Sequence, residues 1–292
     1  MALGIRRHIS LSDLTTLRMG GEAACELTVR GETDFDELSD FLLRETVRPF
    51  VIGKGSNLLA AGDVSDLALV RIQSPATPEQ VGQDGDQVIF RAGAGLHLPA
   101  LLGWAFKSGL SGMEGLSGIP GTVGGAVAMN AGSYGTEMSQ VVRRVRVWTP
   151  TEGLEWIDAA ECAWGYRSFD PGRISRYMIH EVEFALSEST PEKVKAAMKE
   201  TMDRKKAGQP IAAWTAGCVF KNPVGDSAGR LLDQAGFKGR EHGGCRFSPM
   251  HANFLENTGE GTAREAVELI EAAREEVAKR FDVKLETEVI II

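Results

Sequence analysis

The chain has 292 residues, of which 43% are hydrophobic, enough for about two domains with buried cores. Its 40 acidic and 32 basic residues give a formal charge of -8, which disfavours broad binding of nucleic-acid phosphates by clustered lysine and arginine. No stretch approaches the ~20 apolar residues of a membrane-spanning helix, and residues 1–13 lack the apolar core of a signal peptide.

The first half of the chain predicts strands with a few helices. Strands are expected at residues 24–29, 49–52, 67–72, 88–92, 141–148 and 177–186. A helix is expected after Thr33, which is placed as its N-cap, and a second helix at residues 99–107. Strands dominate without a regular alternation with helices, which indicates an α+β fold.

The pattern changes near residues 187–190, where we place a domain boundary. Thr190 and Pro191 open a helix that ends by Gly208, and Thr262 and Glu265 form a capping box for a helix at residues 263–281. Residues 285–292 read as a strand, which must pair with an earlier sheet. The expected domains are 1–188, with subdomains of about 1–72 and 73–188, and 189–292, with the last strand packing on the first subdomain.

Glycine is enriched, with 34 residues, nine of which fall between positions 109 and 135. Six of these recur at every third position from Gly109 to Gly124, but the run is too short and too poor in proline for collagen. Glycines of this kind form either tight turns at a sheet corner or backbone nests that bind anions. A second glycine turn, Gly53-Lys-Gly-Ser-Asn57, follows a strand and matches neither the dinucleotide-binding nor the Walker A motif. Together the two loops suggest a cofactor that carries a diphosphate.

The four cysteines are far apart and include no CxxC pair, so neither a zinc cluster nor a disulfide framework is expected. We expect free thiols, a cytoplasmic protein and no metal site.

Five motifs resemble UDP-N-acetylenolpyruvoylglucosamine reductase and occur in the order typical of that family. They are residues 53–59, 115–125 with 130–135, 165–167, 217–223 and 251–254. The resemblance covers nearly the whole chain from Thr15. It implies an FAD-binding domain of the vanillyl-alcohol-oxidase type and a smaller C-terminal substrate domain. It also implies non-covalently bound FAD, NADPH as reductant, and reduction of an enolpyruvyl ether to give UDP-N-acetylmuramate. We expect a monomer that binds neither nucleic acid nor membrane.

By the same resemblance, both glycine loops hold FAD. The implied contacts are Gly53, Lys54, Gly55, Ser56, Asn57, Gly115, Ser117, Ile119, Gly121, Gly124, Gly125, Ala126, Asn130, Ala131 and Gly132. One subclass of the family carries an extra tyrosine-bearing loop after the arginine motif. Here the stretch from Arg167 to Cys218 is short and contains only Tyr177, so the chain resembles the subclass without that loop.

The resemblance assigns the chemistry to Arg167, Cys218 and Glu288. A guanidinium can hold the substrate carboxylate where negative charge develops. Cys218 stands where the family usually has a serine proton donor, and a thiol is the stronger acid. Glu286 shares the strand face of Glu288, so periodicity leaves both open, and the family's Glu-Val pair favours Glu288.

The implied substrate contacts are Tyr166, Lys221, Asn222 and Gln209, with Lys205 and Lys206 as weaker candidates. His251 is expected to be structural. The family's usual motif has one more residue after Arg167 than this chain, which bears on the local packing. Two other functions stay open: a flavin oxidase on the same scaffold, and an inactive binder of nucleotide sugars.

Overall fold

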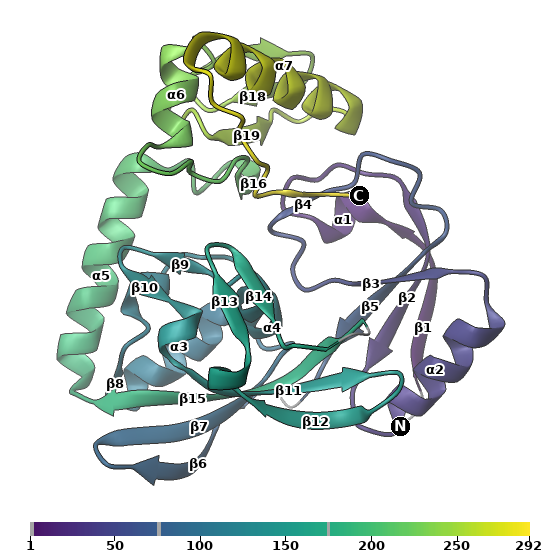
Figure 1. Ribbon diagram of the computed structural model, residues 1–292, viewed down its shortest axis with the longest axis vertical. Coiled ribbons are helices and arrows are strands. Elements are labelled where there is room, and N and C mark those ends of the chain that lie inside the picture. Colours follow the sequence, from purple (N-terminus) through teal and green to yellow (C-terminus); the bar gives the residue numbers. More distant parts are fainter. Residues whose placement is uncertain (1–2, 75–76, 174–175) are drawn as a thin grey trace. The chain divides into compact units, whose positions relative to one another are not determined.

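The computed structural model describes residues 3–74, 77–173 and 176–292. The chain divides into two compact units. The first comprises Met1–Arg6, Glu26–Gly53 and Ala68–Arg204, and the second comprises Arg7–Cys25, Lys54–Leu67 and Lys205–Ile292. Figure 1 labels the elements of both units. The domain boundary expected near residues 187–190 stays a prediction.

The larger sheet of the first unit is antiparallel, in the order β12-β11-β15-β7-β6, with β8 paired to the end of β15. Its strands are β6 (Glu79–Asp84), β7 (Gln87–Gly93), β8 (Leu110–Ser111), β11 (Val142–Thr149), β12 (Gly153–Asp158) and β15 (Met178–Glu188). Phe90 and Phe184 pair across β7 and β15, are fully buried, and stack with ring centroids 5.2 Å apart. Helices α3 (Leu98–Lys107) and α4 (Val123–Ala128) contact this sheet or each other (Figure 1).

A second sheet has the order β1-β2-β5-β3. Its strands are β1 (Gly4–Ser10), β2 (Glu22–Val29), β3 (Arg48–Val51) and β5 (Leu67–Ile72). The inner strands β2 and β5 are buried along most of their length, including the carboxyl group of Glu26 in β2. Helix α2 (Asp34–Arg44) buries Phe35, whose ring stacks on Trp148 at 4.9 Å.

Helix α2 begins directly after Thr33, as predicted, but the Thr33 hydroxyl does not cap it. Thr33 already has helical backbone angles, and its side chain makes no capping hydrogen bond. The carboxylate of Asp34 instead accepts the N–H groups of Arg30 and Gly31, at 2.7 and 3.2 Å. These N–H groups precede the helix, so the Asp34 carboxylate fixes the turn before α2 and does not replace the cap.

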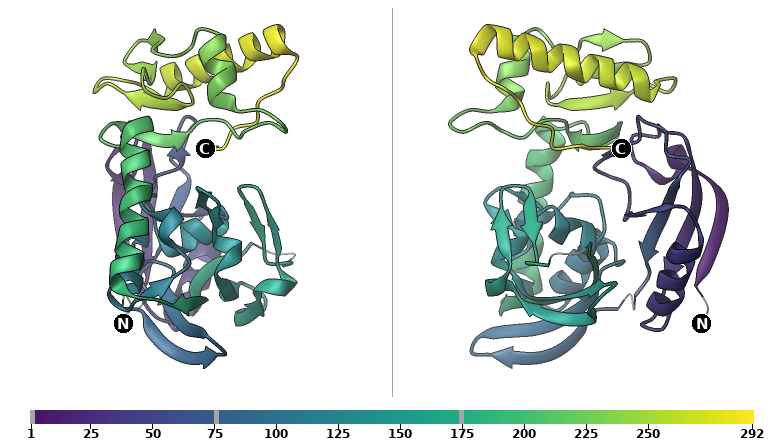
Figure 2. Two further views of the ribbon diagram at one scale, coloured as in Figure 1. Left: turned by 90° about the vertical axis from the view of Figure 1, so that its left-hand side faces the viewer. Right: turned by 45° about the vertical axis from the view of Figure 1, so that its right-hand side comes forward.

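The second unit is built on the antiparallel sheet β16-β19-β18-β17. Its strands are β16 (Trp214–Cys218), β17 (Glu241–His242), β18 (Cys245–Phe247) and β19 (Phe254–Asn257), and its helices include α1 (Leu11–Leu14), α6 (Ala228–Gln234) and α7 (Ala263–Phe281). Helix α7 lies along this sheet (Figure 2) and buries Leu269, Ile270 and Val277 in the core. The capping box predicted for α7 is confirmed. Thr262 Oγ1 accepts the Glu265 N–H, and the Glu265 carboxylate accepts the Thr262 N–H. Helix α5 (Pro191–Gly208) contributes to both units.

The C-terminal strand is much shorter than predicted. Only Ile290–Ile291 forms a strand, β20, which pairs in parallel with β4 (Leu58–Leu59). The preceding residues bond instead to the chain after β16, since Lys221 N–H reaches the Glu286 carbonyl and Glu288 N–H reaches the Val219 carbonyl, both at 2.8 Å. The segment splits its hydrogen bonds between two partners, so the prediction of one continuous strand over residues 285–292 is wrong.

Within the described ranges, no helix is long and apolar enough to cross a membrane. The same residues contain no cluster of three or more His, Cys, Asp or Glu side chains that could hold a metal ion.

Candidate functional site

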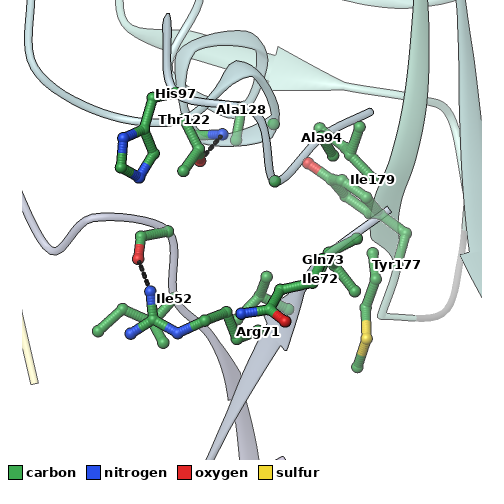
Figure 3. Close-up of a pocket in the computed structure, with 16 residues that line it drawn as sticks. Ile52, Arg71, Ile72, Gln73, Ala94, His97, Thr122, Ala128, Tyr177 and Ile179 are labelled. Carbon is green, nitrogen blue, oxygen red and sulfur yellow. Dashed lines mark hydrogen bonds between the residues drawn. The ribbon is translucent and has the colours of Figure 1, made fainter. Parts of the chain in front are cut away.

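A cavity of about 300 Å³ lies in the first unit (Figure 3). It is lined by residues 51–53, 71–73, 94–95, 97, 122, 124–125, 128 and 177–179. Isoleucine side chains and a methionine give it apolar walls, while Arg71, Gln73, His97 and Thr122 supply polar groups. Apolar walls with a few polar groups are typical of a cofactor pocket.

Gly53, at the end of β3, is held against the cavity by two side chains. A Cβ at this position would lie 2.4 Å from Thr122 Oγ1, so only glycine fits. Arg71 Nη1 donates to the Gly53 carbonyl at 2.8 Å, and its Nη2 lies 3.4 Å from the buried carboxylate of Glu26. Arg71 therefore fixes the first glycine turn and places a cation in the cavity wall.

The N–H groups at the start of α4 donate hydrogen bonds to acceptors within the protein. Val123 and Gly124 donate to the carbonyls of Leu96 and Ala94, at 2.9 and 2.8 Å. Gly125 donates to Thr122 Oγ1 at 3.3 Å. A Cβ on Gly124 would lie 2.9 Å from that of Ala94. These glycines let α4 approach the chain after β7, which explains them without an anion-binding nest.

The hydroxyl group of Ser117 is buried. The residue is 2% exposed, and its Oγ has no hydrogen-bond partner within the described part of the chain. Leaving such a group unpaired costs about 1–3 kcal/mol. A bound polar ligand group would satisfy it, so this position fits the predicted cofactor.

Asn130 joins the glycine-rich segment to the hairpin of β13 (Ala163–Gly165) and β14 (Ser168–Asp170). Its Nδ2 donates to the Gly165 carbonyl at 3.0 Å and to Glu137 at 3.1 Å, and its Oδ1 accepts the Ser139 N–H. Both polar atoms of the Asn130 side chain are thus hydrogen-bonded within the protein. Backbone bonds also fix the rest of the segment, at Ile119, Gly121, Ala126 and Ala131.

Tyr166 and Arg167 form the two-residue turn of that hairpin, between the paired residues Gly165 and Ser168. Arg167 has a φ of 56°, in the left-handed region. Its Nη2 donates to the Gly132 carbonyl at 2.9 Å, and its guanidinium lies 4.9 Å from the Tyr166 ring centroid. The tight turn closes the hairpin with the arginine held in place.

In the second unit, Cys218 and Glu288 lie on neighbouring segments. Cys218 ends β16, opposite Phe254 of β19, and is partly buried. The Glu288 N–H donates to the carbonyl of Val219, the residue after Cys218. Glu286 differs from Glu288: its side chain is 78% exposed and lies 3.7 Å from Lys221 Nζ.

The other loop residues are held by contacts within the second unit. Gly55 has a φ of 62°, and its carbonyl accepts the Thr16 N–H at 3.2 Å. Asn57 Nδ2 donates to the Glu288 carbonyl at 3.0 Å. Lys54 and Ser56 lie in the same loop, in the turn between β3 and β4.

The predicted substrate contacts of this unit occupy three places. Asn222 Oδ1 accepts the Ala228 N–H at the start of α6, at 3.0 Å. Gln209 follows α5, and its backbone N–H donates to the Lys205 carbonyl. The Lys205 side chain is buried, at 3% exposed, whereas Lys206 is exposed. His251 packs edge-to-face on Phe254, and burial lowers its pKa.

Of the predicted cofactor contacts, Gly53, Gly124 and Gly125 line the cavity, whereas the wall formed by described residues does not include Gly115, Ser117 or Asn130. Sequence reasoning missed Arg71, His97 and Thr122. The first two belong to no motif, and only the N-cap position of Thr122 gave a local signal.

The fold and the site define a flavoprotein. A family model described as an FAD binding domain matches residues 23–158. The predicted α+β fold with an FAD-binding domain and a C-terminal domain is confirmed, and the chain is an FAD-dependent oxidoreductase.

A second family model, the C-terminal domain of UDP-N-acetylenolpyruvoylglucosamine reductase, matches residues 209–292. The reductase of Oleidesulfovibrio alaskensis is 45% identical over 283 residues, which are 96% of this chain and 95% of that protein. That of Nitratidesulfovibrio vulgaris is 42% identical over 285 residues, 97% of this chain and 96% of that protein. The crystal structure of the reductase from Thermus caldophilus matches with a TM-score of 0.82, 34% identity and 99% coverage of both chains. The chain belongs to the UDP-N-acetylenolpyruvoylglucosamine reductase family.

Proposed function

We propose that this chain reduces the enolpyruvyl ether of UDP-N-acetylglucosamine enolpyruvate to UDP-N-acetylmuramate, a precursor of peptidoglycan, with NADPH as reductant. The relatives that share 42–45% of its residues carry the name of this reductase. The observation that carries the proposal furthest is the placement of Cys218 and Glu288 on hydrogen-bonded segments. We further propose a monomer in the cytoplasm, where its four free thiols would stay reduced.

FAD would be held without a covalent bond by the two glycine loops and by Ser117, whose buried hydroxyl lacks a protein partner among the described residues. Gly53, Gly124 and Gly125 would lie against it at the cavity wall. When bound, FAD supplies a hydride that it has taken from NADPH. The protein has to bind the substrate, stabilise the charge that develops on it and deliver a proton.

Arg167 would stabilise the negative charge that develops towards the substrate carboxylate. A guanidinium is always charged and can make two parallel hydrogen bonds to a carboxylate. Here the group is already oriented by the Gly132 carbonyl and by the Tyr166 ring. Such preorganised charge commonly supplies a large share of the rate enhancement.

Cys218 would donate the proton to the remaining alkene carbon, and its thiolate would then regain a proton from solvent. A thiol has a reference pKa of about 8.5, far below that of an alcohol, so it can replace the serine usual in this family. Glu288, on the adjoining segment, would stabilise the protonated partner or the enol form.

Tyr166, Lys221, Asn222 and Gln209 would contact the UDP-sugar. We also assign the chain to the subclass without a tyrosine loop, because β15 and α5 make up most of the connection between β14 and β16.

The test is an anaerobic flavin titration. Purified protein should be yellow, and acid precipitation should release the flavin into the supernatant. NADPH should bleach the flavin, and the enolpyruvyl substrate should restore the colour without oxygen. Flavin that precipitates with the protein would indicate a covalent oxidase, for which His97 at the cavity is the nearest candidate. Bleaching without recovery by substrate would indicate an inactive binder.

A further inference from the structure

Asn57 is bonded to a segment 231 positions away in the sequence. Its Nδ2 donates to the Glu288 carbonyl at 3.0 Å. Its own carbonyl accepts the Ile290 N–H, also at 3.0 Å. Asn57 is therefore hydrogen-bonded at two points to the chain on the C-terminal side of Glu288.

The N-terminal side of Glu288 is fixed independently. Its N–H donates to the Val219 carbonyl at 2.8 Å. On the C-terminal side, the Val289 N–H donates to the same oxygen at 3.3 Å, in addition to the bonds made by Asn57. Because the peptide groups on both sides of Glu288 are bonded, its backbone angles and the direction of its Cα–Cβ bond are set. Val219 follows Cys218, so the same bonds relate Glu288 to the strand that carries Cys218.

We propose that Asn57 is a positioning residue for Glu288: the hydrogen bond from its amide to the Glu288 carbonyl sets where the catalytic carboxyl group lies. The inference rests on the proposed function of Glu288. In this role Asn57 would affect the reaction through Glu288, separately from any contact of its loop with FAD.

The bond itself is tested in the protein without FAD. Asn57→Leu keeps a similar size and removes the donor. Since a hydrogen bond contributes about 1 kcal/mol, amide hydrogen exchange of residues 285–292 should accelerate by roughly fivefold to tenfold. Asn257→Leu is the matched control, because Asn257 Nδ2 also donates to a distant carbonyl of the same unit, that of Leu17, at 3.0 Å. It should leave exchange of residues 285–292 unchanged. Asn57→Ala, which also removes the donor, replaces Asn57→Leu should that variant not fold.

The effect on the reaction is tested by a double-mutant cycle at saturating FAD. Asn57→Leu should slow reoxidation of the reduced flavin by substrate about tenfold or more beyond any effect on flavin reduction by NADPH, which is measured in the same variant. In a Glu288→Gln background the same substitution should add little. The role of Asn57 would be overturned if Asn57→Leu and Glu288→Gln slowed reoxidation by independent, multiplying factors. It would also be overturned if amide exchange of residues 285–292 were unchanged in Asn57→Leu. Wild-type reoxidation in Glu288→Gln alone would instead contradict the function proposed for Glu288, and the role of Asn57 with it.

Discussion

Cys218 is the residue that we propose as the proton donor, at the position where the resemblance leads us to expect a serine. It lies beside Gly217, whose φ of 81° turns the chain at the end of β16, and it is partly exposed. A thiol that is accessible and weakly acidic suits proton donation and is also open to oxidation. Cys245 of the same unit differs, since burial raises the pKa of its thiol to about 12.

Replacing Cys218 separates the two halves of the reaction. Cys218→Ala should leave flavin reduction by NADPH nearly intact and slow reoxidation by substrate about 10²-fold or more, the usual size of an acid–base contribution. Cys218→Ser should recover much of that loss, because it restores a proton donor. Stopped-flow absorbance of the flavin under anaerobic conditions measures both rates. Unchanged reoxidation in Cys218→Ala would show that another group donates the proton.

Among the secondary-structure elements, the turn after β3 depends on a glycine that packs against the start of α4. A methyl group at Gly53 would collide with Thr122 Oγ1, which is committed to capping α4. Gly53→Ala should therefore cost about 1–3 kcal/mol and lower FAD affinity roughly tenfold or more, measured by titrating the apoprotein. Gly103→Ala, within α3 and with no atom within 4 Å of its new methyl, is the control and should bind FAD like the wild type. Equal affinities in all three proteins would contradict the role of Gly53.

Strand β15 carries a carboxyl group that links stability to acid pH. The contact with His180 and the hydrogen bond from Arg146 lower the pKa of Glu181 from 4.5 to about 2. The carboxylate form is favoured in the folded protein, so this stabilisation is complete above pH 4.5 and is lost as the pH falls towards 2.

The free energy of unfolding should fall less steeply in Glu181→Gln than in the wild type between pH 4.5 and about 2. The difference between the two falls should be at most about 3 kcal/mol. Urea denaturation at several pH values measures it. Glu188→Gln, at the exposed end of the same strand, should keep the wild-type dependence. A Glu181→Gln profile that parallels the wild type would contradict the assignment.

The elements that sequence reasoning predicted well are specified by local patterns. Strand β5 and helix α7 have the predicted bounds, because a run of apolar residues and a capping box lie within the elements themselves. The C-terminal strand failed because its hydrogen bonds depend on two distant partners. Arg71 and His97 were missed for the same reason, since strand pairing and packing bring them to the cavity from separate segments.

The purpose assigned to the glycines also changes with the structure. The sequence predicts N–H groups available to a diphosphate, whereas those of Gly124 and Gly125 donate within the protein. Close approach of α4 to Ala94 is what requires Gly124. A glycine pattern predicts backbone proximity better than it predicts the partner of each N–H group.

For the whole molecule, the family match spans both units, and the proposed catalytic residues are divided between them: Arg167 belongs to the first unit, and Cys218 and Glu288 belong to the second. In the proposed mechanism the first unit would supply charge stabilisation and the second would supply the proton. The proposed function therefore concerns the intact chain, and its decisive test uses the intact chain.

That test is the stoichiometry of NADPH oxidation in the absence of oxygen, with identification of the product. With UDP-N-acetylglucosamine enolpyruvate supplied in limiting amount, each substrate molecule should consume one NADPH, and mass spectrometry should find UDP-N-acetylmuramate, heavier by two hydrogens. NADPH oxidation that needs oxygen and leaves the enolpyruvyl ether intact would contradict the account.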